Sequence, residues 1–287
     1  MSIGDFHMHS TQSDGVLSPT ELIDLAASRG IRVMALTDHD TLAGVEEAIA
    51  AAARHPGFTL IPGVELSCDV PGSEVHMLGH FVDRTNRDFV DQLDRFRAGR
   101  VERAEKMVAT LDGLGVPIDW DRVLEIAGEG SVGRPHVAQA LLEQGHVESI
   151  TDAFDRYLGR NSPAYAEREK LTPTEAIEMI RNANGLPVFA HPSFTKDYEA
   201  TAASLAADGL FGMEVFYKAY PPDLVQSLHE LATSLDLFAL GGSDYHGLGN
   251  DDDRDPGDIP LPDTVAEAYL VAAREAGCEL PEPTPAG

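Results

Sequence analysis

The chain has 287 residues and a mass of 30.9 kDa, which is enough for one α/β barrel with an inserted segment. Its net charge of −27 disfavours stable binding of duplex DNA, and it has neither a signal-peptide start nor an apolar run of about eighteen residues, so we expect a cytoplasmic protein without a membrane span. Its two cysteines, Cys68 and Cys278, lack the spacing of a zinc or redox motif.

Apolar runs alternate with helical stretches, which is the pattern of βα units. The predicted strands are Ile3–His7, Arg32–Leu36, Thr59–Ile61, Val75–Phe81, Pro187–Ala190, Gly212–Phe216 and Leu237–Gly241. The clearest predicted helices between them are Ser18–Arg29, Val45–Ala53, Thr172–Ala183 and Pro222–Leu235, two of which begin with a Ser or Thr before proline.

The middle of the chain is different, because from about Arg97 it has helical patterns and no convincing strand. The helices predicted there are Phe96–Leu114, Asp121–Gly128, Arg134–Gln144 and Ile150–Leu158. We interpret residues 97–172 as a helical cap inserted between two barrel segments, 1–96 and 173–287. The cap holds ten Lys or Arg and thirteen Asp or Glu, so it is far less acidic than the remainder and is where an anion is expected.

Potential metal ligands recur at the ends of the predicted strands. His7 and His9 are two residues apart, so in a strand both imidazoles would point to one face. Imidazole and carboxylate ligands without paired thiolates suit Zn, Mn or Fe at a catalytic centre, and α/β barrels place their chemistry at strand ends. The sequence therefore predicts a metal cluster of His7, His9, Asp14, His39, Glu65, His76, His191, Asp244 and His246.

Each of these residues has a structural alternative when taken alone. A single histidine is commonly a surface or hydrogen-bonded core residue, and Asp14 or Asp244 could form an Asx-turn. Asp38 and Asp40, which flank His39, could either orient that ligand or cap a helical turn. The joint arrangement favours the metal interpretation.

The motifs DxHxH, TDH, GxE, a further His, HP and a final DxH occur in this order, so the chain resembles the PHP (polymerase and histidinol phosphatase) superfamily over about residues 1–95 and 173–262. The resemblance implies a distorted (β/α)7 barrel with two or three divalent metal ions. It would place His7, His9, Glu65 and Asp244 on one ion, Glu65, His76 and His191 on a second, and Asp14, His39 and His246 on a third. Asp14 stands where some relatives have histidine.

Such a centre suits phosphate ester hydrolysis. If Glu65 bridged two cations, they could share a hydroxide aimed at phosphorus and neutralise the phosphate oxygens. Catalysis would then be mediated by the metals on His7, His9, Glu65 and Asp244, without a separate protein nucleophile.

The predicted cap offers cations for a substrate phosphate. Arg100 and Arg103 lie three residues apart on one helix face, where they could bind a phosphate or instead form a solvated face with neighbouring glutamates. Arg134 and His136 stand at a predicted helix start, which also favours an anion. Arg160 and Tyr165 are weaker candidates that could serve only to join the cap to the barrel.

The segments LDRFRAGRVERAEKM and GRPH resemble one PHP branch, the 3′,5′-nucleoside bisphosphate phosphatases and related 5′-to-3′ exoribonucleases. This resemblance implies hydrolysis of nucleoside mono- or 3′,5′-bisphosphates, with short single-stranded RNA as the alternative substrate. The acidic balance favours the small nucleotide. A noncatalytic interaction module and a metal-dependent amide or lactone hydrolase are disfavoured by the full ligand set and by the cap arginines, respectively.

Overall fold

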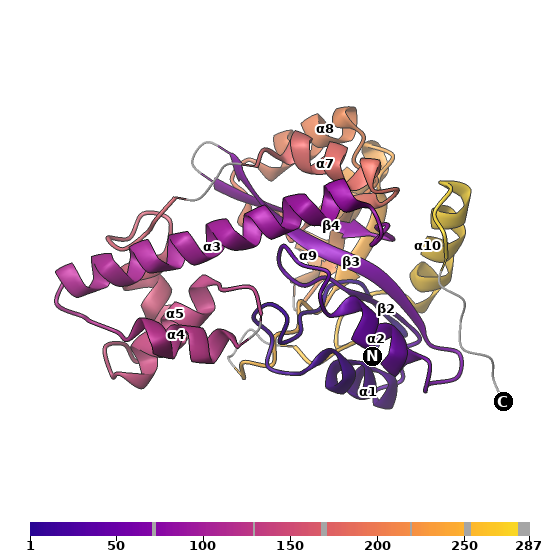
Figure 1. The fold of residues 1–287 in the computed structure, drawn as a ribbon. Coiled ribbons are helices and arrows are strands. Elements are labelled where there is room, and N and C mark those ends of the chain that lie inside the picture. Colours follow the sequence, from indigo (N-terminus) through magenta and orange to yellow (C-terminus); the bar gives the residue numbers. More distant parts are fainter. Residues whose placement is uncertain (71–72, 129, 168–170, 219, 250–253, 281–287) are drawn as a thin grey trace.

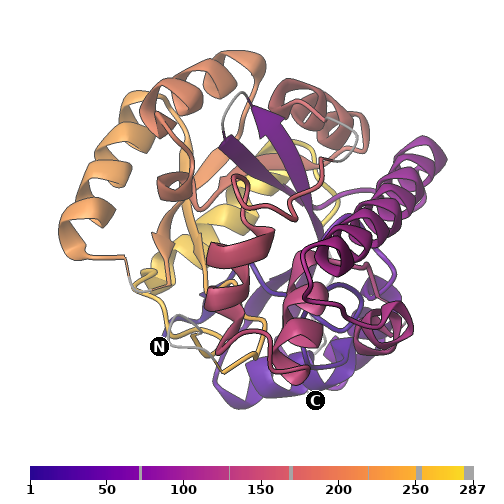
Figure 2. The same cartoon turned by 90° about the vertical axis from the view of Figure 1, so that its left-hand side faces the viewer.

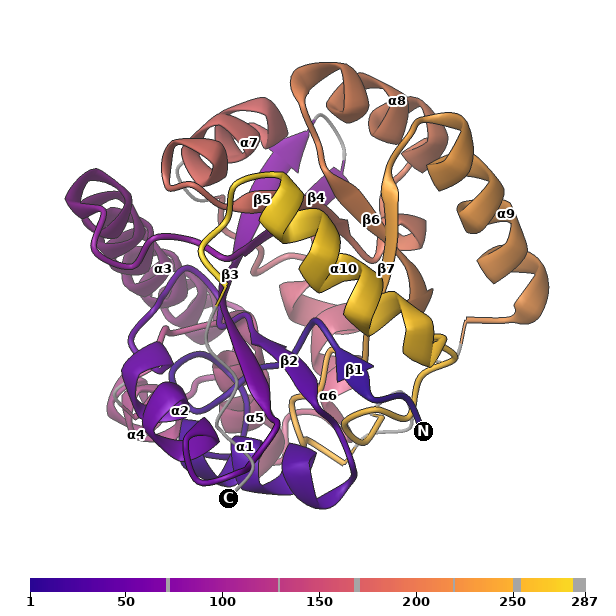
Figure 3. The ribbon, with the colours of Figure 1, turned by 90° about the vertical axis from the view of Figure 1, so that its right-hand side faces the viewer.

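The computed structural model describes residues 1–70, 73–128, 130–167, 171–218, 220–249 and 254–280. Seven strands form one sheet in chain order, which curls into a nearly closed barrel (Figures 1 and 3). At the seam, Phe6 N donates to Gly241 O at 3.2 Å, and Met8 pairs with Tyr245. The predicted α/β class and distorted seven-stranded barrel are confirmed. The strands are β1 (Gly4–Asp5), β2 (Val33–Leu36), β3 (Thr59–Val70), β4 (Ser73–His80), β5 (Leu186–Ala190), β6 (Gly212–Tyr217) and β7 (Phe238–Gly242).

Strands β3 and β4 depart from the predicted succession of βα units. They form an antiparallel hairpin, and β4 is also antiparallel to β5, whereas the other neighbours are parallel. Strand β3 continues past the predicted end at Ile61 because β4 pairs with it from Gly63 to Val70. Gly63 allows β3 to approach β2 closely, since a Cβ at this position would lie only 2.8 Å from Leu36 O. The hairpin carries Glu65 and His76 in mid-strand.

In the described part of the chain, the helices that pack on the barrel are α1 (Pro19–Ser28), α2 (Val45–Ala52), α7 (Pro173–Asn182), α8 (Tyr198–Asp208), α9 (Pro222–Ser234) and α10 (Asp263–Glu275). Ser18 and Thr172 are N-caps, as the Ser/Thr-Pro pattern predicted, and each also forms a capping box, with Glu21 and Glu175 respectively. Helices α8 and α10 were not among the predicted helices. Helix α10 closes one end of the barrel (Figure 3), where the buried Tyr269 packs against Phe6, Phe211 and Phe238.

The remaining helices project to one side of the barrel, and Figure 2 shows them in front of its other end. They are α3 (Arg87–Gly113), α4 (Trp120–Ala127), α5 (Arg134–Glu143), α6 (Ile150–Ala153) and the π-helical turn η1 (Phe154–Leu158). A separate apolar cluster holds them together, with its buried members between Ala104 and Ala164. Helix α3 starts nine residues before the predicted Phe96 and crosses the proposed division at residue 97, packing Phe89 and Leu93 on the barrel core and Met107 on the cap core.

Within the described ranges, no helix combines the length and the apolar composition needed to cross a bilayer.

Candidate active site

The nine predicted ligand residues meet at the end of the barrel that faces the cap. Asp14 lies in the loop between β1 and α1, Glu65 lies within β3, and His76 lies within β4. The others follow the carboxyl ends of strands: His7 and His9 follow β1, His39 follows β2, His191 follows β5, and Asp244 and His246 follow β7. The Nε2 atoms of His7 and His9 are 3.1 Å apart, so both imidazoles lie on one side as the alternation predicted.

Glu65 lies at the centre of this cluster, with 1% of its surface exposed. Its two carboxylate oxygens face different imidazoles. Oε2 lies 3.2 Å from His7 Nε2, 3.1 Å from His9 Nε2 and 3.2 Å from His39 Nδ1. Oε1 lies 2.6 Å from His76 Nδ1 and 3.2 Å from His191 Nε2. Because each oxygen faces its own set of imidazoles, Glu65 has the arrangement that a carboxylate shared by two cations would need.

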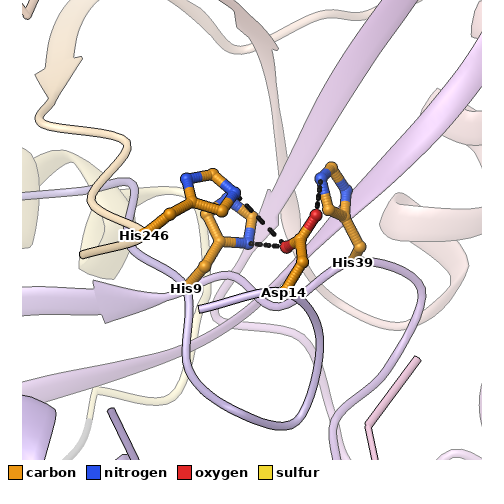
Figure 4. A group of neighbouring side chains, drawn as sticks. All are labelled: His9, Asp14, His39 and His246. Atoms are coloured by element: carbon orange, nitrogen blue, oxygen red, sulfur yellow. Dashed lines mark ion pairs between the residues drawn. The ribbon is translucent and has the colours of Figure 1, made fainter. Parts of the chain in front are cut away.

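Three groups of these residues bring their ligand atoms within 4.8 Å of one another. They are His7, His9, Glu65 and Asp244; His39, Glu65 and His76; and His9, Asp14, His39 and His246. Figure 4 shows the last group, in which Asp14 faces the three imidazoles, the shortest approach being 3.3 Å from Oδ1 to His246 Nε2. The first group coincides with the set that the family resemblance implied. The second has His39 where the implied set has His191, although His191 Nε2 lies 3.2 Å from Glu65 Oε1, and the third adds His9 to the implied set.

The chemistry of the cluster fits divalent cations. Asp14 Oδ1, His39 Nδ1 and Glu65 Oε2 are buried and make no hydrogen bond with any described residue. A buried polar atom without a partner costs about 1–3 kcal/mol, so three such atoms converging on one place indicate a missing positive partner. Imidazole nitrogens and carboxylate oxygens are the ligands of Zn, Mn and Fe(II) centres.

The electrostatics of the cluster agree with this. Burial alone would raise the pKa of Glu65, but the surrounding imidazoles, His39 foremost, hold that pKa well below its usual range. Burial would also raise the pKa of Asp244, but nearby positive charge, chiefly that of Lys218, holds it well below its usual range. Burial would lower the pKa of His9, yet the neighbouring carboxylates raise it to about 10. The site therefore attracts positive charge, and a bound cation would displace protons from the imidazoles.

Two carboxylates outside the ligand set fix the ligands in place. Glu214 in β6 is buried; its Oε1 lies 3.1 Å from His7 Nδ1, and its Oε2 accepts from His191 N at 2.6 Å. Asp38 accepts from Ser13 Oγ at 2.7 Å, and that hydroxyl lies 3.3 Å from His9 Nδ1. Asp38 therefore supports His9 rather than the predicted His39, Asp40 pairs with Arg100 of the cap, and helix α2 takes Gly44 as its N-cap.

Glu214 was missed by the sequence interpretation because it lies inside the apolar run GMEVFY. A carboxylate in the middle of a buried strand was itself the signal, since such a group is rarely buried without a partner. Tyr217 and Lys218, at the end of β6, were missed as well. Both contact Asp244 Oδ2, the hydroxyl at 2.7 Å and Nζ at 3.1 Å.

A cavity of about 150 Å³ separates the ligand cluster from the cap. Asp14, His39, His76 and His246 line it on the barrel side, and Arg100, Arg103, Arg134, Met107 and Phe154 line it on the cap side. A single small molecule in this cavity can therefore contact both the ligand cluster and the arginines. The sequence predicted both sides but gave no information on the distance between them.

The three arginines differ in how they are held. Arg100 and Arg103 are each 8% exposed, so the alternative of a solvated face is wrong. Arg100 Nε donates to Asp40 at 2.5 Å, which joins the cap to the barrel, and Arg103 Nε donates to Ala166 O at 2.8 Å. Arg134 is the most accessible and makes one hydrogen bond to the described residues, from Nη2 to Glu74 Oε2 at 2.8 Å.

Glu74 is a second site residue that the sequence interpretation missed. It lines the cavity. Burial would raise its pKa, but Arg134, His76 and Arg103 lower that pKa to about 2. His136, in contrast, does not line this cavity: its Nδ1 accepts from Gly133 N at 2.9 Å, and its ring borders a different hollow beside residues 11–13. Tyr165 stacks on Arg103, whose carbon Cζ lies 5.1 Å from the ring centre.

Comparison with known proteins relates the whole arrangement to one family. The family model described as PHP domain matches residues 5–159. A 5′-3′ exoribonuclease of Haemophilus influenzae is 38% identical over 246 residues, which is 84% of this chain and 89% of that protein. A 3′,5′-nucleoside bisphosphate phosphatase of Chromobacterium violaceum is 34% identical over 253 residues, which is 85% of this chain and 87% of that protein. A solved structure assigned as a metal-dependent phosphoesterase, from Bifidobacterium adolescentis, matches with a TM-score of 0.84 at 32% identity and covers 93% of this chain and 95% of its own.

Proposed function

Since this chain belongs to the PHP domain family and is a metal-dependent phosphoesterase, we propose that its substrate is a small nucleotide, with nucleoside 3′,5′-bisphosphates preferred. The observation that carries this proposal is the cavity shared by the ligand cluster and Arg134. One phosphate would lie over the ligand cluster while a second lies against the cap. A relative with this substrate in its name supports the same choice.

The roles of the residues follow from their contacts. Bound divalent cations would supply an activated water molecule and neutralise the transferring phosphate. His7, His9, Glu65 and Asp244 would hold the cations at the reacting phosphate, with Glu65 spanning two positions. Arg134 would bind the second phosphate through the guanidinium nitrogens that Glu74 leaves available. Arg100 and Arg103, fixed by their own partners, add positive potential on the same wall.

We propose three cation positions, one for each ligand group, with Mn, Zn or Fe as the candidate ions. The division of the contacts between the two oxygens of Glu65 supports at least two positions, and Asp14, which faces His9, His39 and His246, supports the third. Metal analysis of the purified protein should therefore find close to three ions per chain. Removing the third group by Asp14→Ala should lower this number by one and leave the other two in place.

A panel of substrates tests the proposed function. Adenosine 3′,5′-bisphosphate, AMP and a short 5′-phosphorylated oligoribonucleotide should be compared at equal enzyme and metal concentration. We expect kcat/KM to be highest for the bisphosphate. A thousandfold preference for the oligoribonucleotide, about 4 kcal/mol in transition-state binding, would instead assign the chain to the exoribonuclease activity named for its relative from Haemophilus influenzae.

A further inference from the structure

Phe194 is an exposed aromatic residue next to the ligand cluster. It ends the short 3-10 helix η2 (Pro192–Phe194) and is 68% exposed, the most exposed large apolar side chain of the described residues after Met1. A single exposed apolar residue is ordinary on a protein surface. The surroundings of this one are not, because its ring centre lies 5.5 Å from that of His191 and 5.9 Å from that of Tyr217.

Both neighbours belong to the candidate site. His191 approaches Glu65 at 3.2 Å, and the hydroxyl of Tyr217 donates to Asp244 at 2.7 Å. Their rings contact that of Phe194, Tyr217 in an edge-to-face arrangement and His191 at an inclined angle. Most of the phenyl ring is nevertheless left to solvent beside the ligand cluster.

The segment that carries Phe194 is hydrogen-bonded to the strand that carries Glu74, a residue that lines the cavity. The next residue, Thr195, donates from Oγ1 to the backbone oxygen of Glu74 at 3.2 Å, and the side chain of Glu74 holds Arg134. Phe194 and Arg134 are therefore linked through two residues, Thr195 and Glu74, with the ligand cluster beside them. This arrangement offers three contacts to a substrate: cations for one phosphate, a guanidinium for another, and an aromatic face for a flat apolar group.

We propose that Phe194 stacks on the nucleobase of the substrate and thereby determines the preference for nucleotides over other bisphosphates. This inference rests on the proposed nucleotide function and adds the residue that recognises the base. Every base has a π-face, so stacking on Phe194 provides affinity without selecting among the bases. The base can belong to a mononucleotide or to the second nucleotide of a short RNA, and substrates with and without the second base distinguish these two cases.

The test compares Phe194→Ala and Phe194→Leu with Phe194→Tyr, which keeps the ring. The substrates are adenosine 3′,5′-bisphosphate and the abasic 1-deoxyribose 3,5-bisphosphate. We expect the first two variants to raise KM for the nucleotide about tenfold, equivalent to about 1.4 kcal/mol, with little change in kcat, while Phe194→Tyr keeps the wild-type value. For the abasic compound, all variants should match the wild type. Because the side chain is exposed, these variants should keep the wild-type Tm.

The matched control is Val271→Ala, which changes an exposed apolar side chain on α10 at the other end of the barrel. It should change neither KM nor kcat. An unchanged KM for the nucleotide in Phe194→Ala would overturn the stacking role while leaving the proposed function intact. A wild-type enzyme that hydrolyses neither bisphosphate would instead refute the proposed function. To identify the stacked base, Phe194→Ala should also be tested on the dinucleotide pApA and on the same dinucleotide without its second base. If the variant raises KM only when the second base is present, the ring binds the second nucleotide of an RNA rather than the base of a mononucleotide.

Discussion

Glu214 Oε1 lies 3.1 Å from His7 Nδ1, and this contact turns the Nε2 atom of His7 toward Glu65. The other oxygen of Glu214 holds the backbone of His191, whose φ of 30° is unusual for a residue other than glycine. One buried carboxylate in β6 thus positions ligands on both sides of Glu65.

Replacing this carboxylate should weaken cation binding. In Glu214→Gln the amide can satisfy only one of the two contacts as an acceptor, so His7 or His191 loses its orientation. We expect affinity for Mn²⁺ or Zn²⁺, measured by calorimetry, to fall by about 10–100-fold, the range typical of such supporting residues. The same substitution at the exposed Glu230 on α9 should have no effect. Wild-type affinity in Glu214→Gln would show that His7 is oriented by other contacts.

Arg134→Ala should separate substrates by their number of phosphates. Loss of a charged hydrogen-bond donor costs about 1.5–3 kcal/mol, so kcat/KM for adenosine 3′,5′-bisphosphate should fall by about 10–150-fold, while that for AMP changes little. Arg122→Ala, on the exposed face of the cap where Arg122 pairs with Glu143, controls for loss of a cap arginine. Equal losses on both substrates would refute the second-phosphate role.

His80 should make stability depend on pH. It is fully buried between Tyr269 and the backbone of Phe6, and burial lowers its pKa to about 3. Between about pH 3 and 6.5 the unfolded chain therefore binds a proton at this residue that the folded protein does not, so stability falls as the pH falls below 6.5.

The expected slope is about 1.4 kcal/mol of unfolding free energy per pH unit in that range. Urea unfolding of wild type and His80→Gln at several pH values from 5 to 8 measures it. Below pH 6.5 the wild type should lose stability more steeply than the variant, and above about pH 7.5 the two curves should run parallel. Parallel curves throughout would show that His80 is not held neutral in the folded protein.

The sequence predicted much of this arrangement because each relevant signal was local. Strand-end histidines such as His39 and His191 lie where a parallel barrel must bring them together, and the Ser18 and Thr172 capping boxes mark helix starts within four residues. Residue types and their spacing were therefore sufficient to predict the barrel and the end of it at which the ligand cluster lies.

What the sequence did not predict depends on long-range contacts. Helix α8 was missed because its residues are mostly small and its N-cap, Asp197, has a left-handed backbone without a side-chain cap. The extension of β3 depends on pairing with β4, and the pairing of Arg100 with Asp40 joins residues 60 positions apart. His136 lies at a predicted helix start but lines a different hollow from the one that the arginines line, and only the packing of α5 decides its position.

The most direct test of the account is phosphate release from adenosine 3′,5′-bisphosphate before and after removal of metal ions. We expect chelation followed by gel filtration to abolish the activity, and stoichiometric Mn²⁺, Zn²⁺ or Fe²⁺ to restore it in the wild type but not in Glu65→Gln, whose amide cannot bridge two cations. Hydrolysis at the full rate by the chelated protein, with metal content confirmed near zero, would contradict the account.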